Sequence, residues 1–146
     1  LIGQVGAQGG IGYAVEYAGA AVRNLPIEGR LTLCNMSIEF SAKYGFVPPD
    51  EATIAYLAGR EFSPKGADWD AAVARWKQLP TDEGATYAKQ LILEADELEP
   101  MITFGTNPGM GMPISGAIPN PASVSDPIEK SDLTKALKYM DLQLCV

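Results

Sequence analysis

The stretch of residues 32–45, TLCNMSIEFSAKYG, most restricts the possible fold because it is largely apolar yet carries Asn35 and Glu39 near its middle. On a helix, residues four apart lie on one face, so these two side chains would point the same way. The apolar residues around them predict a single helix that is buried nearly all round. A buried carboxylate without a partner is costly or takes up a proton. We therefore expect the pair to face a polar cavity, a metal centre or a cationic ligand.

The length and composition are those of one soluble globular domain. The chain has 146 residues, of which 47% are apolar. Its formal charge of -7 and its lack of a basic cluster argue against a nucleic-acid partner. No apolar run approaches the length of a membrane span, and the first residues lack the basic region of a signal peptide. We expect a cytoplasmic protein without a membrane partner.

The scarcity of histidine and cysteine limits the possible chemistry. Histidine is absent, which removes the common nucleophile-base triads and most zinc hydrolase sites. The two cysteines, Cys34 and Cys145, are far apart in the sequence and lack the close pairing of a zinc or redox motif. We predict that Cys34 is a packed helix residue and assign no metal ligand within the chain.

The local patterns predict an α/β fold in which helices pack on a small mixed sheet. A glycine-rich segment near the start matches neither the dinucleotide fingerprint nor the P-loop, so we predict a turn after a helix. Gly45 is expected to end the helix over 26–45, and Asp50 to cap the next one. Helices are predicted over 19–25, 26–45, 50–57, 68–79 and 132–142, strands over 11–17, 87–94 and 101–104, and an irregular connection over 105–127.

Several longer segments together give a specific resemblance. TLCNMSIE is preceded by GYAVEYAG and EGR, and it is followed by GFVPPDEATIAYLAGR and DWDAAVARWKQLPTDEGATY. The chain therefore resembles the isopropylmalate dehydratase branch of the aconitase family over residues 1–107 and again at ALKYM. The asparagine-methionine-x-x-glutamate core resembles aconitase more widely.

The resemblance implies an aconitase-like α/β/α domain, of which residues 1–146 would be a single partial domain. The family pattern places an upstream segment and a downstream segment with the cluster cysteines outside this chain. The complete large subunit would interconvert 2-isopropylmalate and 3-isopropylmalate by dehydration and rehydration in leucine biosynthesis. It would act on this small hydroxy-diacid together with a small subunit and would carry a 4Fe-4S cluster. We expect this segment alone to bind no cluster and to be inactive.

The resemblance also assigns roles to two residues. Asn35 matches the family's asparagine that hydrogen-bonds at the cluster, which implies cofactor binding. Glu39 matches the glutamate that hydrogen-bonds the hydroxyl or water on the open iron, which implies a catalytic role in proton exchange. Phe40 and Ser41 replace the alanine and glycine that usually follow this glutamate, so tighter packing is expected there.

Two other hypotheses remain open at this point. The segment could come from an aconitase or homoaconitase, because substrate choice in the family is implied to depend largely on the small subunit or domain. It could instead be a non-catalytic interaction domain on the same scaffold. In that case Asn35 and Glu39 would be a satisfied polar pair.

Overall fold

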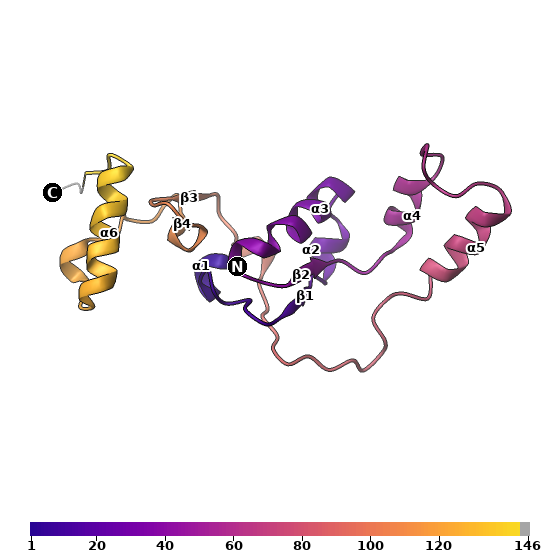
Figure 1. Ribbon diagram of the computed structural model, residues 1–146, viewed down its shortest axis with the longest axis horizontal. Coiled ribbons are helices and arrows are strands. Elements are labelled where there is room, and N and C mark those ends of the chain that lie inside the picture. The colour runs from indigo at the N-terminus through magenta and orange to yellow at the C-terminus, as the bar shows by residue number, and fades with distance from the viewer. Residues whose placement is uncertain (144–146) are drawn as a thin grey trace. The chain divides into compact units, whose positions relative to one another are not determined.

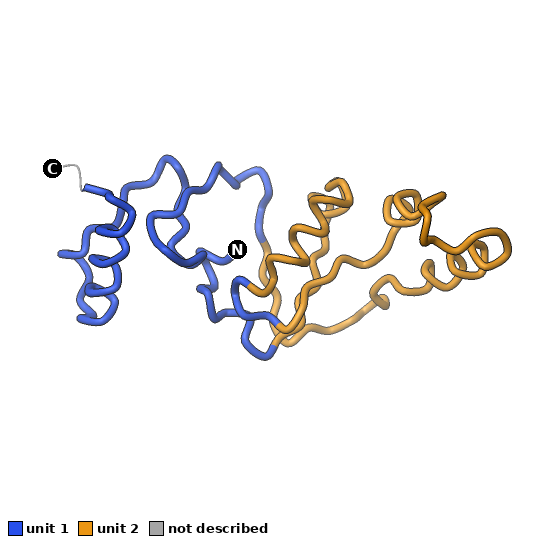
Figure 2. Tube along the Cα trace, turned by 45° about the horizontal axis from the view of Figure 1, so that its top comes forward, with its two compact units in different colours: residues 1–12, 39–42, 93–146 blue, residues 13–38, 43–92 orange. Residues whose placement is uncertain are grey.

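The computed structural model describes residues 1–143 and is shown in Figure 1. The chain divides into two compact units, coloured separately in Figure 2. Unit 1 consists of residues 1–12, 39–42 and 93–146, and unit 2 of residues 13–38 and 43–92. The 3-10 helix η1 (Met36–Phe40) begins in unit 2 and ends in unit 1.

Unit 2 is built from four helices and one pair of strands. The strands β1 (Ala14–Glu16) and β2 (Tyr44–Phe46) are parallel, with Ala14 opposite Tyr44. The predicted cap at Asp50 is confirmed, because its side chain accepts a hydrogen bond from the Thr53 backbone. The helices are α2 (Ala20–Arg23), α3 (Ile27–Asn35), α4 (Glu51–Leu57) and α5 (Ala67–Trp76).

Unit 1 has its main buried face on α6 (Pro127–Tyr139), where Leu133, Ala136 and Leu137 are buried. This helix begins earlier than predicted because Asp126 caps it and proline occupies the first turn. The remaining elements are α1 (Ile2–Val5), η2 (Ala95–Glu97), β3 (Met101–Thr103), η3 (Pro108–Met110), β4 (Gly111–Pro113) and η4 (Pro121–Ser123).

The predicted α/β class is confirmed. In the part of the chain that the structure describes, the strands form one parallel pair, β1 with β2, and one antiparallel pair, β3 with β4. Strand β4 lies inside the segment that was predicted to be irregular, where it pairs with β3. Among the helices within residues 1–143, none has the length and apolar character needed to cross a membrane.

The strand predicted over residues 87–94 is wrong. This segment has no strand structure, and Ile92 within it is 73% exposed. Side-chain contacts hold it instead: the Tyr87 hydroxyl donates to Glu16 at 3.0 Å, and the Lys89 ammonium lies 4.9 Å from the centre of the Tyr13 ring. The segment contains residue types that favour strands, but its backbone is not hydrogen-bonded to a neighbouring strand among the described residues.

Candidate functional site

The helix predicted over residues 26–45 is present in its first part, but the prediction that it continues to Gly45 is wrong. The α-helix ends at Asn35, and η1 follows it before the chain enters β2. Where the α-helix gives way to η1, Ser37 Oγ donates a hydrogen bond to the carbonyl of Leu33, 3.0 Å away. A serine that bonds the carbonyl four residues back competes with the regular helical pattern and often bends the helix. This contact accounts for the irregular turn between Asn35 and Glu39.

The predicted burial of this segment is also wrong. Asn35 and Glu39 are both exposed, and the apolar Ile38 between them is 66% exposed. The carboxylate of Glu39 is therefore solvated in this chain and needs no buried partner here. Asn35 belongs to unit 2 and Glu39 to unit 1, so the two candidates are not part of one compact unit.

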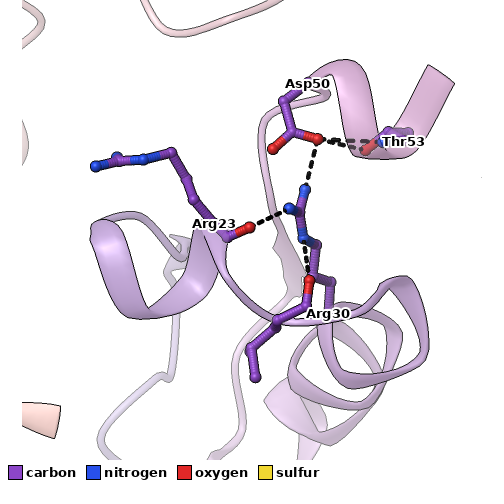
Figure 3. Close-up of polar contacts among 5 residues, drawn as sticks. Arg23, Arg30, Asp50 and Thr53 are labelled. Atoms are coloured by element: carbon purple, nitrogen blue, oxygen red, sulfur yellow. Dashed lines mark hydrogen bonds and ion pairs between the residues drawn. The ribbon is translucent and has the colours of Figure 1, made fainter. Parts of the chain in front are cut away.

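The buried polar residues here are Ser37, within the segment, and Arg30, just before it on α3; the motif singled out neither. Figure 3 shows Arg30 reaching two partners: its guanidinium donates to Asp50 Oδ1 and to the carbonyl of Arg23, each at 2.7 Å. A third bond runs to the carbonyl of Leu25 at 3.2 Å. Arg30 thereby joins the end of α2, the start of α3 and the cap of α4.

The Arg30 guanidinium also affects the charge state of its partner. Its hydrogen bond to Asp50 is the main cause that lowers the pKa of that carboxyl below its ordinary value of 3.8. The backbone amide of Thr53 acts in the same direction by donating to Asp50 Oδ1 at 3.1 Å. Asp50 is therefore held in its charged form, in which it can both pair with Arg30 and cap α4.

Ser37 connects the end of α3 to the β1–β2 pair. Its side chain is fully buried, and Oγ lies 2.8 Å from the Tyr17 hydroxyl. Because the single Ser37 proton is directed at Leu33, the Tyr17 hydroxyl is the donor in this pair. A Cβ on Gly45 would overlap Ser37 Oγ and lie 2.9 Å from Tyr17 Cε2. Gly45 is thus a strand residue required by close packing, and its predicted role as a helix terminator is wrong.

The residues after Glu39 pack against the glycine-rich segment near the start of the chain. Phe40 is 4% exposed, and its carbonyl accepts a hydrogen bond from the Gly10 amide at 2.8 Å. Ser41 has a φ of 67°, and its hydroxyl donates to the carbonyl of Ala7 at 2.9 Å. The predicted turn after a helix is confirmed, since Gly6 closes α1 with a φ of 78°. The packing of this turn against Phe40 had no signal in the local sequence.

The described residues do not by themselves fit a 4Fe-4S cluster. Such clusters are held mainly by cysteine thiolates. Within residues 1–143, no three His, Cys, Asp or Glu side chains are grouped so that they could hold a metal ion. Cys34 is a half-buried free thiol, and Cys145 lies outside the described residues.

Two surface hollows in unit 1 involve neither predicted site residue. The first lies between residues 106–110 and α6, where Asp132, Lys135 and Tyr139 contribute side chains. The second lies between α1 and the β3–β4 pair and includes Glu97 and Glu99. Asn35 and Glu39 line neither hollow.

Residues 1–144 match the aconitase family (aconitate hydratase). The chain is 57% identical over 143 residues to the 3-isopropylmalate dehydratase large subunit of Solibacter usitatus, covering 98% of this chain and 31% of that protein. Its identity to the subunit of the same name from Anaeromyxobacter dehalogenans is 54% over 142 residues, 97% of this chain and 30% of that protein. The Roseiflexus castenholzii subunit is 52% identical over 143 residues, 98% of this chain and 30% of that protein. The chain thus spans about a third of the length of these relatives.

Proposed function

The chain belongs to the aconitase family, and on this premise we propose that it forms part of the large subunit of a 3-isopropylmalate dehydratase. One observation carries this proposal: an identity of 57% over nearly the whole chain to a large subunit of that name. The two further relatives bear the same name at 52% and 54% identity. These names favour the isopropylmalate reaction over that of aconitase or homoaconitase.

The reaction removes a hydroxyl and a proton from adjacent carbons and returns them with their positions exchanged. It needs a group that orients the hydroxyl or water and a group that exchanges a proton with it. Glu39 is suited to this task because its carboxylate is exposed while the next residue, Phe40, is buried. Asn35 would offer its amide as a hydrogen-bonding group beside the cofactor.

The cofactor and the partner belong to the same proposal. A 4Fe-4S cluster in the complete enzyme would supply Lewis-acid chemistry toward the hydroxyl group. The two cysteines of this chain are too few to hold it, so its ligands would come from other residues of the complete protein. A small subunit, implied by the name of the relatives, would complete the site. This segment alone would be inactive, and the complete protein would act in the cytoplasm.

The decisive experiment compares Glu39→Gln with the unchanged complete protein, assembled with its small subunit. We expect turnover of 3-isopropylmalate to fall at least about tenfold, since a positioned acid-base group is typically worth about 100-fold or more. Iron and sulfide content should stay the same. Glu83→Gln is the matched control because Glu83 is an exposed glutamate outside the site, and it should keep full turnover.

Other outcomes would contradict the proposal in distinct ways. Unchanged turnover of Glu39→Gln at normal iron content would remove Glu39 from the reaction. Preferred turnover of citrate or homocitrate would assign the chain to an aconitase or a homoaconitase. A colourless complete protein without iron or sulfide would favour an interaction domain on the same scaffold.

A further inference from the structure

We propose that the glycine-rich loop of residues 6–12 is a positioning element for Glu39. The loop fixes the backbone directly after Glu39 and leaves the carboxylate itself exposed. This inference rests on the proposed role of Glu39. It adds a function for the loop, whose spacing matches neither the dinucleotide fingerprint nor the P-loop.

Gly10 makes the closest contact between the loop and the segment that follows Glu39. Its amide donates to the Phe40 carbonyl at 2.8 Å. A Cβ placed on Gly10 would lie 2.8 Å from Phe40 Cδ2, from the Phe40 carbonyl oxygen and from the Ala42 amide nitrogen. Two of these three atoms belong to the backbone and cannot turn away as a side chain can. Only glycine fits at this position without moving the backbone next to Glu39.

The other side of the loop is held by α1. A Cβ on Gly9 would lie 2.6 Å from both the Cβ and the carbonyl oxygen of Val5. The loop is therefore confined between Val5 on one side and Phe40 on the other. Glycine is therefore needed at both Gly9 and Gly10 because a side chain would collide with neighbouring atoms, and not because the backbone angles require it.

The amides at the centre of the loop are already used within the protein. Gly9 donates to the carbonyl of Gly6 at 3.2 Å, and Ile11 donates to that of Gln8 at 3.2 Å. Together with the Gly10 bond to Phe40, this leaves three successive amides directed at backbone carbonyls. A phosphate-binding loop needs its amides directed at the ligand. These hydrogen bonds therefore favour a structural role for the loop over a role in binding an anion.

Two further contacts extend the support beyond Phe40. The Ser41 hydroxyl bonds the Ala7 carbonyl at 2.9 Å, and Ala42 forms an antiparallel bridge with Ile11. Three consecutive residues after Glu39 are thus tied to the loop. Catalytic groups act fastest when their backbone is held in place before the substrate arrives, and a misplacement of about 1 Å can cost about 100-fold in rate.

The test is Gly10→Ala in the complete protein with its small subunit, with Gly3→Ala as the matched control. A Cβ on Gly3 would meet only the Gly111 carbonyl at an ordinary 3.5 Å, so this variant should keep normal turnover. We expect Gly10→Ala to lower kcat about tenfold or more while KM and iron content stay close to normal. In the Glu39→Gln background, the same substitution should cause no further loss of kcat, because the group that the loop positions is gone.

A loss of the same factor in both backgrounds, or no loss in either, would overturn the positioning role while leaving the role of Glu39 intact. If Glu39→Gln itself keeps full turnover, both the proposed function of Glu39 and the positioning role fail. Should Gly10→Ala not fold, Ser41→Ala takes its place, since it removes only the hydrogen bond to Ala7. It should lower kcat in the parent protein and not in the Glu39→Gln background, and any other pattern would overturn the inference.

Discussion

Arg30 and Asp50 form an ion pair of 2.7 Å in which the arginine side chain is only 5% exposed and the aspartate side chain 34% exposed. The same carboxylate oxygen, Oδ1, also accepts the backbone amide of Thr53 in the first turn of α4. One side chain thus neutralises a buried cation and caps a helix. This shared use links the helix that carries Asn35 to the helix that follows β2.

We predict that the stability of the α4 start depends on acid pH through Asp50. Because its pKa is lowered in the folded protein, its contribution is complete above the ordinary value of 3.8 and is lost as the pH falls through the lower, folded value. We compare the exchange rate of the Thr53 amide with the rate that an unprotected amide has at the same pH. This relative rate should be higher at about pH 3 than at about pH 6. In Asp50→Asn this extra dependence should disappear. An unchanged pH dependence in that variant would assign the effect to another group.

Arg30→Lys should destabilise the protein although it conserves the charge. Arg30 donates to Asp50 and to the carbonyls of Arg23 and Leu25 from one planar group. A lysine ammonium cannot reproduce this geometry, so at least one of these two carbonyls would lose its partner. We expect a loss of about 1–3 kcal/mol, measured by denaturant unfolding. The exposed Arg75→Lys is the matched control, and equal stability of the two variants would contradict this explanation.

Gly45→Ala and Ser37→Ala should each destabilise the protein, and their effects should not add. The first substitution forces a methyl group onto Ser37 Oγ and should cost about 1–3 kcal/mol. The second removes the partner of the Tyr17 hydroxyl and of the Leu33 carbonyl. In the double variant the overlapping oxygen is absent, so Gly45→Ala should cost less than it does alone. Denaturant unfolding of the four proteins checks this, and strict additivity would argue against the contact.

Features that depend on neighbouring residues were predicted well from the sequence. The cap at Asp50 and the turn after the first helix both follow from local backbone requirements. The helix predicted over 68–79 is present as α5, on which Trp69 and Trp76 pack edge to face with ring centres 5.7 Å apart. Each of these signals lies within one or two helical turns of sequence.

Features that depend on distant partners were not predicted. Ser37, which bonds the Leu33 carbonyl where α3 ends, is buried together with a second partner, the half-buried Tyr17, that lies twenty residues away. Arg30 gave no signal because Asp50 is also twenty residues distant. The motif identified Asn35 and Glu39 as candidates, yet their exposure could not be read from an apolar pattern. That pattern does not distinguish burial within these residues from burial by other parts of a longer protein.

Ser41 offers a test of local strain beside Glu39. Its φ of 67° is in the left-handed region, which costs a residue with a Cβ about 1–2 kcal/mol relative to right-handed backbone. Ser41→Ala would keep this cost and lose the hydrogen bond to Ala7, so it should destabilise the protein by about 0.5–1.5 kcal/mol. Ser41→Gly would lose the same bond but relieve the strain. Since greater freedom of glycine in the unfolded chain offsets part of that relief, we expect the glycine variant to be more stable than the alanine variant by about 1 kcal/mol. Denaturant unfolding of the two variants measures this difference directly, and equal stabilities would mean that residue 41 does not hold a strained backbone in solution.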